Sequence, residues 1–304
     1  MFLRNLRALL SVVKHRNFTR ASEEVCLSQP ALSQKIKQLE EQLGVVLLDR
    51  SNRVIRPTDV GEVYLYHARR ALNELEMGYR AIHDVQDLSR GSLRVGFTPT
   101  FSAYLIGPLF KRFYQLYPHI KLHLRELSQE QIEKDLLEGD IDLGVAFVSP
   151  ESEHIRYQPL FTERLAVAVG ENSSLYHQTM MTLDEIATAP MVLLSQDFAT
   201  RCYIDRYFNQ HQLRPNLAIE ANSISTILDL VKNSELVSIL PQAIIEKQSK
   251  IHAIELMPML PERIAALLQH KTHYTNAASQ AFKALIDAEF TQVVFEQPVI
   301  FEQT

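Results

Sequence analysis

The chain has few cysteines and no long apolar run. Its 304 residues include only Cys26 and Cys202, which is too few for a disulfide framework and typical of a reducing compartment, so we expect a cytoplasmic protein. No uncharged apolar stretch reaches the roughly 18 residues of a membrane-spanning helix, so no membrane partner is expected. Residues 1–18 carry arginines within their apolar run and have no small-residue cleavage site. They are therefore expected to form an amphipathic helix rather than a signal peptide.

The common signatures of enzymes are also absent. The chain contains no GxSxG elbow, no GxGxxG or P-loop phosphate motif, and no HExxH or CxxC pair. His252, His270 and His273 are scattered without the spacing of metal ligands. We therefore expect a protein that is not an enzyme and that has neither a cofactor nor a metal site.

Charge is distributed unevenly along the chain, whose net charge is −5. Residues 1–58 contain ten Lys or Arg and five Asp or Glu, whereas the rest contains 21 basic and 31 acidic residues. A basic end joined to an acidic body is typical of a nucleic-acid-binding module attached to a second domain. On charge alone, a solvated basic face without such a role explains the pattern equally well.

Three helical patterns occupy the first 44 residues, over 4–14, 20–26 and 28–44. Ser28 suits the N-cap of the third helix, Pro30 is tolerated in its first turn, and Gly44 fits the left-handed position that ends a helix. The second and third helices, joined by a short turn, predict a helix-turn-helix. Residues 45–48 form an apolar run, residues 51–52 suit a turn, and residues 54–55 resume an extended pattern, which together predict a two-stranded wing.

The third helix turns polar side chains away from its apolar stripe. Glutamine amides match adenine edges in a major groove, a serine hydroxyl matches several bases, and Pro30 or Ala31 suits a thymine methyl. Lysine and the wing arginines suit phosphates or a minor groove. The alternative is an ordinary solvated helix face. The residues that we predict to contact DNA are Thr19, Ser28, Gln29, Pro30, Ser33, Gln34, Lys37, Arg50, Arg53 and Arg56.

A long helix is expected after this module. Residues 58 to about 88 contain no proline and place apolar residues at spacings of three and four. A rise of ~1.5 Å per residue gives a helix of about 45 Å, which is too long to be buried alone. Pairing with a second copy and packing on the chain's own core are both consistent with this pattern. We assign 1–58 to the DNA-binding domain and 59–90 to the linker helix and hinge.

Residues 91–304 predict an α/β body of two lobes. A β-α-β-α-β order runs from 93 to 147, with a helix expected over 104–117 and a nearly all-apolar strand over 141–147, as in a buried parallel sheet. A similar order restarts at about 160, and a further strand over 263–270 and a last helix over 277–290 are expected. We place lobe I at about 92–161 and 266–304, and lobe II at about 162–265.

Ligands of open α/β sheets bind at the carboxyl ends of the strands. Hydroxyl groups and helix-start amides at these loops suit a small anion, although each hydroxyl residue is also an ordinary cap or turn residue. The predicted effector-binding residues are Thr98, Pro99, Thr100, Phe101, Ser128, Gln129, Phe147, Thr200 and Ser223.

The N-terminal segment resembles a known family. It reads SQPALSQKIKQLEEQLGVVLLDR, followed by RVIRPTDVG, and is similar to the signature of LysR-type transcriptional regulators. Leu48 stands where that family usually has phenylalanine, which is an apolar exchange at a packing position. The resemblance implies a winged helix-turn-helix, a linker helix that dimerises, and a periplasmic-binding-protein-like effector domain. It also implies double-stranded DNA with an imperfect palindromic operator, a dimer or homotetramer, and contact with RNA polymerase.

Four body segments resemble the members of this family that regulate bacterial cyanate-degradation operons: GSLRVGFTPTFSAYLIGPL, ELSQEQIE, LLSQDFATR and IEANSISTILDLV. This resemblance implies an activator that responds to cyanate, with azide as a mimic. There are two alternatives. The chain is a LysR-type regulator of another metabolic operon with a different small anionic effector, or it is a solute-binding protein that does not regulate transcription. Peroxide-sensing members use two cysteines in the body, whereas this body has only Cys202, which argues against redox sensing.

Overall fold

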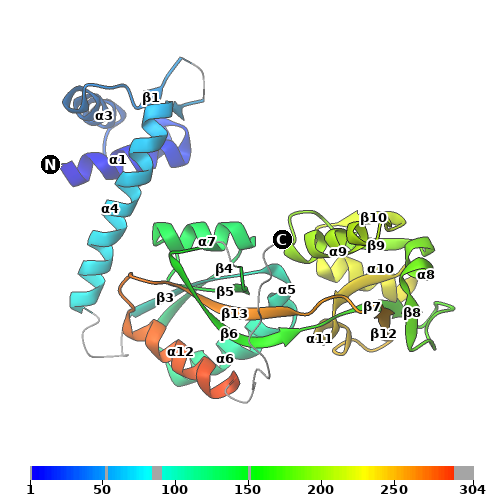
Figure 1. Cartoon of the computed structure of the whole chain (residues 1–304). Helices are drawn as coiled ribbons and strands as arrows, with labels where there is room; N and C mark the ends of the chain where they lie inside the picture. The colour runs from blue at the N-terminus through cyan, green and yellow to red at the C-terminus, as the bar shows by residue number, and fades with distance from the viewer. Residues whose placement is uncertain (1, 52–53, 84–90, 150–151, 291–304) are drawn as a thin grey trace. The chain divides into compact units, whose positions relative to one another are not determined.

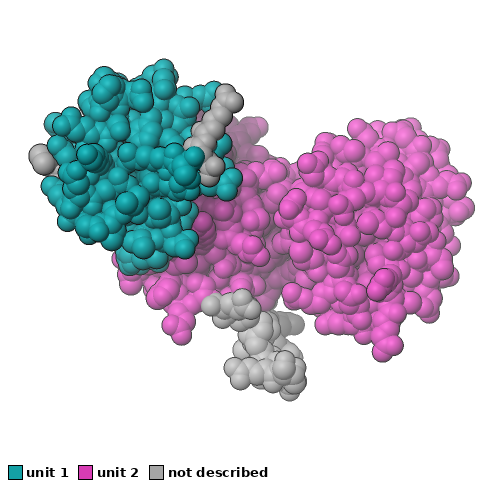
Figure 2. Space-filling model, turned by 90° about the horizontal axis from the view of Figure 1, so that it is seen from above, with its two compact units in different colours: residues 1–83 teal, residues 84–304 magenta. Residues whose placement is uncertain are grey.

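A computed structural model describes residues 2–51, 54–83, 91–149 and 152–290. The chain forms two compact units, residues 1–83 and residues 84–304 (Figures 1 and 2). Arg53, most of the predicted hinge and the end of the chain from residue 291 lie outside the described residues. In the described part of the chain, no helix combines the length and the apolar character that crossing a membrane requires.

Unit 1 is a winged helix-turn-helix followed by a long helix. Asn17 caps the second helix by accepting from two backbone amides, and Ser28 caps the third, which ends at Gly44 with φ +69°. These caps explain why the chain turns at the expected positions. The elements are α1 (Phe2–His15), α2 (Phe18–Glu24), α3 (Gln29–Leu43), β1 (Leu48–Asp49), β2 (Arg56–Pro57) and α4 (Asp59–His83).

The start of α4 is fixed against the wing. The Thr58 hydroxyl accepts from the Gly61 amide at 2.9 Å and donates to the Val46 carbonyl at 2.8 Å. A Cβ on Gly61 would lie 2.1 Å from the Leu47 carbonyl oxygen, so this close approach requires glycine. The TxxG pair therefore joins the long helix to the DNA-binding module.

The apolar stripe of α4 is only partly covered within unit 1. Leu65, Ala68 and Leu72 are buried in the same core as the first three helices. Leu75 and Tyr79 continue this stripe at heptad spacing but are exposed. The first half of α4 thus packs on the chain's own core, while Leu75 and Tyr79 in the second half are exposed to solvent.

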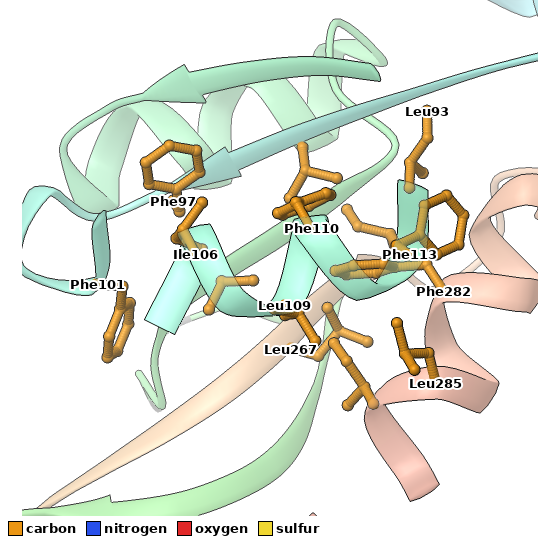
Figure 3. Packing of buried hydrophobic residues seen from close by; sticks show 14 of the residues in the cluster. Leu93, Phe97, Phe101, Ile106, Leu109, Phe110, Phe113, Leu267, Phe282 and Leu285 are labelled. Atoms are coloured by element: carbon orange, nitrogen blue, oxygen red, sulfur yellow. The ribbon is translucent and has the colours of Figure 1, made fainter. Parts of the chain in front are cut away.

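Lobe I of unit 2 is built on a five-stranded sheet with the order β4-β3-β5-β13-β6. The first three strands are parallel, and β13 runs antiparallel to both of its neighbours. Helices α6 (Gly107–Leu116) and α12 close the core through Phe110, Phe113 and Phe282 (Figure 3). The strands are β3 (Gly91–Phe97), β4 (Ile120–Glu126), β5 (Leu143–Phe147), β6 (Ile155–Glu163) and β13 (Arg263–His270), and the helices α7 (Gln129–Glu138) and α12 (Ala277–Phe290).

The helix expected over 104–117 begins earlier and is irregular. It comprises α5 (Pro99–Phe101), a π-helical turn η1 (Ser102–Ile106) and α6 (Gly107–Leu116). Pro108 has no amide hydrogen to donate to the preceding turn, so the regular α-helical pattern is interrupted there. The expected helix start at Tyr104 was therefore wrong by five residues.

Lobe II contains a four-stranded sheet, β11-β7-β12-β8, and a parallel pair, β10-β9. Two long strands, β6 and β13, lead from lobe I toward it (Figure 1). The strands are β7 (Leu165–Gly170), β8 (Met180–Thr182), β9 (Met191–Leu194), β10 (Leu217–Ala221), β11 (Ser238–Pro241) and β12 (Ile251–Met257). The helices are α8 (Leu183–Thr188), α9 (Ala199–Gln210), α10 (Ile224–Asn233) and α11 (Gln242–Ile245).

Candidate functional sites

Helix α3 presents the polar face that its sequence predicts. Leu32, Ile36 and Leu39 are buried in the core of unit 1. The opposite side is open to solvent and combines amides, a proline and a cation, which is the chemistry needed to contact base edges and phosphates. The exposed residues there are Gln29, Pro30, Gln34 and Lys37, with Ser33 half-buried beside them.

Three other predicted DNA contacts have different surroundings. The Ser28 hydroxyl accepts from the Ala31 amide at 3.4 Å and therefore serves as a cap. Thr19 is exposed in the first turn of α2, and Arg56 is exposed on the second wing strand. The geometry leaves Thr19 and Arg56 accessible to a duplex, whereas the position of Arg53 is not described.

Arg50 is exposed, but its guanidinium is engaged by contacts within unit 1. Its Nη2 donates to Glu40 Oε2 at 2.8 Å, and its guanidinium carbon lies 5.3 Å from the centre of the Phe18 ring. The other Glu40 oxygen accepts from the Leu47 and Leu48 amides at 2.9 and 3.1 Å. Glu40, which sequence reasoning missed, therefore joins α3 to the wing, and Arg50 completes this joint. An acidic residue late in α3, directly before the wing, was the only available signal.

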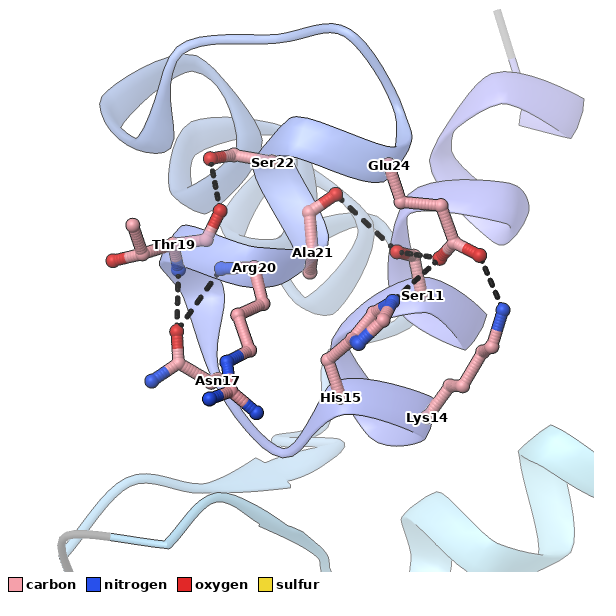
Figure 4. Close-up of polar contacts among 9 residues, drawn as sticks. All are labelled: Ser11, Lys14, His15, Asn17, Thr19, Arg20, Ala21, Ser22 and Glu24. Carbon is pink, nitrogen blue, oxygen red and sulfur yellow. Dashed lines mark hydrogen bonds and ion pairs between the residues drawn. The ribbon is translucent and has the colours of Figure 1, made fainter.

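A second carboxylate joins α1 to α2 (Figure 4). Glu24 accepts from the Ser11 hydroxyl at 2.5 Å, pairs with Lys14, and lies 3.1 Å from His15 Nε2. The hydrogen bonds from Lys14 and Ser11 lower the pKa of Glu24 to about 2. The first helix is thereby fixed against the helix-turn-helix.

The predicted effector residues divide into two groups. Ser128 and Ser223 accept from amides three residues ahead and act as helix caps. Around Phe147, by contrast, several predicted residues converge. The Gln129 side chain hydrogen-bonds both the amide and the carbonyl of Phe147, at 3.0 and 2.8 Å, and the Phe101 ring centre is 5.0 Å from that of Phe147.

Most of the remaining predicted residues lie between the end of β3 and Phe101 in α5. Thr98 and Thr100 are buried there, and the Pro99 carbonyl accepts from the Ser102 hydroxyl at 2.7 Å. Thr200, in the first turn of α9, is buried and approaches from lobe II.

Arg263, at the start of β13, connects these residues and was not predicted. Its guanidinium carbon lies 4.0 Å from the centre of the Phe147 ring. Nη2 donates to Thr200 Oγ1 at 3.1 Å and also pairs with Glu163. The guanidinium also lies 5.3 Å from the centre of the Tyr203 ring, so one buried group on β13 contacts β5, β6 and two residues of α9.

Tyr104 extends this cluster. Its hydroxyl donates to Glu163 Oε1 at 2.7 Å, and burial, reinforced by this carboxylate, raises the pKa of the phenol. Lys247, which follows α11, donates to the Tyr104 carbonyl at 2.7 Å. The cluster thus joins the two lobes with a polar, charged network next to the predicted strand ends.

Other candidate chemistry is sparse among the described residues. They include no group of three or more His, Cys, Asp or Glu that would hold a metal ion. Cys202 is exposed on α9, where its Sγ lies 3.3 Å from the Gln196 carbonyl, and Cys26 belongs to unit 1.

Fold and sites together define a DNA-binding module joined to a two-lobed ligand-binding body. The family models agree: residues 3–62 match the bacterial regulatory helix-turn-helix protein of the lysR family, and residues 86–291 match the LysR substrate binding domain. The chain belongs to the LysR family of DNA-binding transcriptional regulators, which respond to an effector.

Known relatives span most of the chain. The transcriptional regulator AlsR of Bacillus subtilis is 28% identical over 76% of this chain and 77% of its own. The regulator OxyR of Escherichia coli is 25% identical over 97% and 99%. A full-length OxyR structure from Pseudomonas aeruginosa superposes with a TM-score of 0.75 at 22% identity, covering 98% of this chain and 99% of that one. A CbnR structure in complex with its target DNA gives 0.68 at 22% identity, covering 95% and 99%.

Proposed function

We propose that this regulator recognises a two-fold, imperfectly palindromic operator through α3 and the wing, and activates transcription when its body binds a small anion. The exposed polar face of α3, opposite a fully buried stripe, is the observation that carries the proposal. It supplies base-reading side chains on a rigid helix, as a helix-turn-helix requires. Contact with RNA polymerase at the promoter belongs to the same proposal.

Substitutions on this face test the DNA interface. Gln34→Ala removes an amide suited to a base edge, so it should relax sequence preference and cost about 1–3 kcal/mol at the preferred site. Arg56→Ala and Arg53→Ala should weaken binding to all sequences alike. Lys121→Ala, which removes an exposed cation from strand β4 of the body, is the control and should change neither quantity. Unchanged operator affinity in Gln34→Ala and both arginine variants would refute this interface.

For the effector we propose cyanate. The similarity of the four body segments to cyanate-operon regulators, together with the buried Arg263 and Thr200 near the predicted strand ends, supports a compact anion. Calorimetric titration of the full chain should give saturable binding of cyanate, matched by azide and exceeding that of bicarbonate and chloride. Equal responses to all four anions would leave the regulator without an assigned effector.

We further propose that the exposed part of α4 pairs with a second copy. Leu75 and Tyr79 extend the buried heptad stripe beyond unit 1, and Val60 and Val63 are exposed on another side of the helix. Two copies would align two recognition helices with a two-fold site. Light scattering should show a dimer or tetramer for the wild type and smaller species for Leu75→Glu/Tyr79→Glu. An unchanged mass in the double variant would place the interface elsewhere.

A further inference from the structure

The guanidinium of Arg263 is buried but only partly hydrogen-bonded. Its side chain is 5% exposed. Nη2 serves both Glu163 and Thr200, while Nε and Nη1 find no hydrogen-bond partner among the described residues. Two unpartnered charged donors inside a protein are unfavourable because they have lost their hydration without replacement. Such a group is stabilised by any bound molecule that supplies acceptor atoms.

A second unpartnered polar atom lies at the neighbouring strand end. Phe97, the last residue of β3, pairs with Val145 of β5, and β5 ends at Phe147. The residue after Phe97 therefore lies beside the end of β5. That residue is Thr98, whose buried Oγ1 likewise has no hydrogen-bond partner among the described residues. The Phe147 ring, in turn, lies against the Arg263 guanidinium. Thr98 thus stands at the end of the strand beside the one whose last residue, Phe147, contacts the Arg263 guanidinium.

The charge around Arg263 favours a monoanion over a dianion. The buried carboxylate of Glu163 already pairs with the guanidinium and also accepts from the Tyr104 hydroxyl. The backbone carbonyl of Tyr104 accepts from Lys247. Lys247 thus contacts this carbonyl rather than the carboxylate, so Arg263 is the cation that pairs with Glu163. Every negative charge on a ligand is repelled by Glu163, so a compact monoanion meets less repulsion at the guanidinium than a larger or doubly charged ligand.

We propose that Arg263 is the anion receptor of the effector site, binding a compact monoanion through Nε–H and Nη1–H with the Thr98 hydroxyl as an additional donor. This inference rests on the proposed response to a small anion, and it assigns the residue that recognises the charge. The anion competes with Glu163 for the guanidinium. Because Arg263 also donates to Thr200 on α9, occupancy changes contacts on both lobes.

Titration of the full chain with sodium cyanate and sodium azide tests the assignment. Arg263→Lys keeps the charge but not the fork of donors, so it should weaken binding by about ten- to a hundredfold. Arg94→Lys is the matched control, because Arg94 is bound by two nitrogens to Asp142 in lobe I. It should leave anion affinity unchanged.

Two further variants keep the test informative if Arg263→Lys folds poorly. Thr98→Val removes a buried hydroxyl that has no partner among the described residues, so the thermal midpoint should stay or rise while anion affinity falls severalfold. Ser238→Ala also removes a buried hydroxyl of this kind, but from β11, and should leave affinity unchanged. Glu163→Gln removes the competing carboxylate and should tighten anion binding, which a merely structural ion pair would not do.

The outcomes separate this inference from the effector proposal. If the wild type binds neither anion, both fail. If it binds but Arg263→Lys and Thr98→Val bind equally well, or Glu163→Gln weakens binding, the anion site lies elsewhere and only the assignment of Arg263 is overturned.

Discussion

Glu40 makes two kinds of contact in unit 1, and its removal should lower the stability of the folded chain. One carboxylate oxygen accepts from two wing amides, and the other pairs with Arg50. Glu40→Ala leaves those amides without their acceptor, so we expect a loss of about 1–3 kcal/mol, measured as a lower urea midpoint of the full chain. Glu41→Ala, which removes only an exposed pair with Lys37, is the control. Equal midpoints for the two variants would contradict this role of Glu40.

For single residues, the sequence indicated which side chains have the chemistry that a site needs. It did not indicate which of these side chains are engaged by other residues of the protein. Arg50 appeared equivalent to Arg53 and Arg56 because the three recur along the wing, yet Glu40 and Phe18 hold Arg50. Arg263 appeared to be an ordinary strand start. Its burial depends on Glu163, which lies a hundred residues earlier in the chain, and no local pattern encodes a contact at that separation.

The joint between α1 and α2 should respond to acid. The folded pKa of Glu24, about 2, lies below the ordinary value of 4.5. Its contribution to stability is therefore complete above pH 4.5 and is lost as the pH falls toward 2. Glu24→Gln should have a lower urea midpoint than the wild type at pH 6, and the difference should shrink below pH 4.5. Glu23→Gln, which changes an exposed neighbour on α2, is the control and should leave the urea midpoint at pH 6 unchanged.

Helix α7 packs on lobe I through glycine. A Cβ on Gly144 would lie 2.6 Å from Ile132 Cγ2, so Gly144→Ala should destabilise the full chain by about 1–3 kcal/mol through overpacking. Gly144→Ala/Ile132→Ala removes the clashing Cγ2, so in thermal denaturation the double variant should lose less stability than the sum of the two single variants. Gly78→Ala is the matched control, since a Cβ there meets nothing within 4 Å on an exposed stretch of α4. It should stabilise the helix by up to about 1 kcal/mol.

Elements with strong local signals could be predicted, whereas those set by the rest of the fold could not. The bounds of β13 and α12 match the expected 263–270 and 277–290, because both have continuous apolar patterns and clear ends. Strand β6 was not predicted because Gln158 and Pro159 interrupt its pattern. Its place at the sheet edge, with a register shift opposite Ala265 and Ala266, tolerates the proline. This edge position is a property of the sheet rather than of the segment.

For the whole molecule, the separation of charge should determine how DNA binding depends on salt. Residues 1–58 carry the excess of basic residues while the rest of the chain is acidic, so attraction to phosphates must come from unit 1 and the body opposes it. Operator affinity should therefore fall steeply with salt, in proportion to the number of phosphate contacts. Lys37→Ala should reduce the slope of log K against log salt by about 1, because its exposed ammonium is expected to contact a phosphate.

The same measurement distinguishes the two kinds of contact assigned to α3. Gln34→Ala removes no charge, so its salt slope should equal that of the wild type although its affinity for the preferred site is lower. Fluorescence anisotropy of a labelled duplex between about 50 and 200 mM salt gives both quantities. A slope that changes in Gln34→Ala but not in Lys37→Ala would reverse the two roles. It would mean that α3 is turned differently toward the duplex, with Gln34 beside the backbone and Lys37 at the base edges.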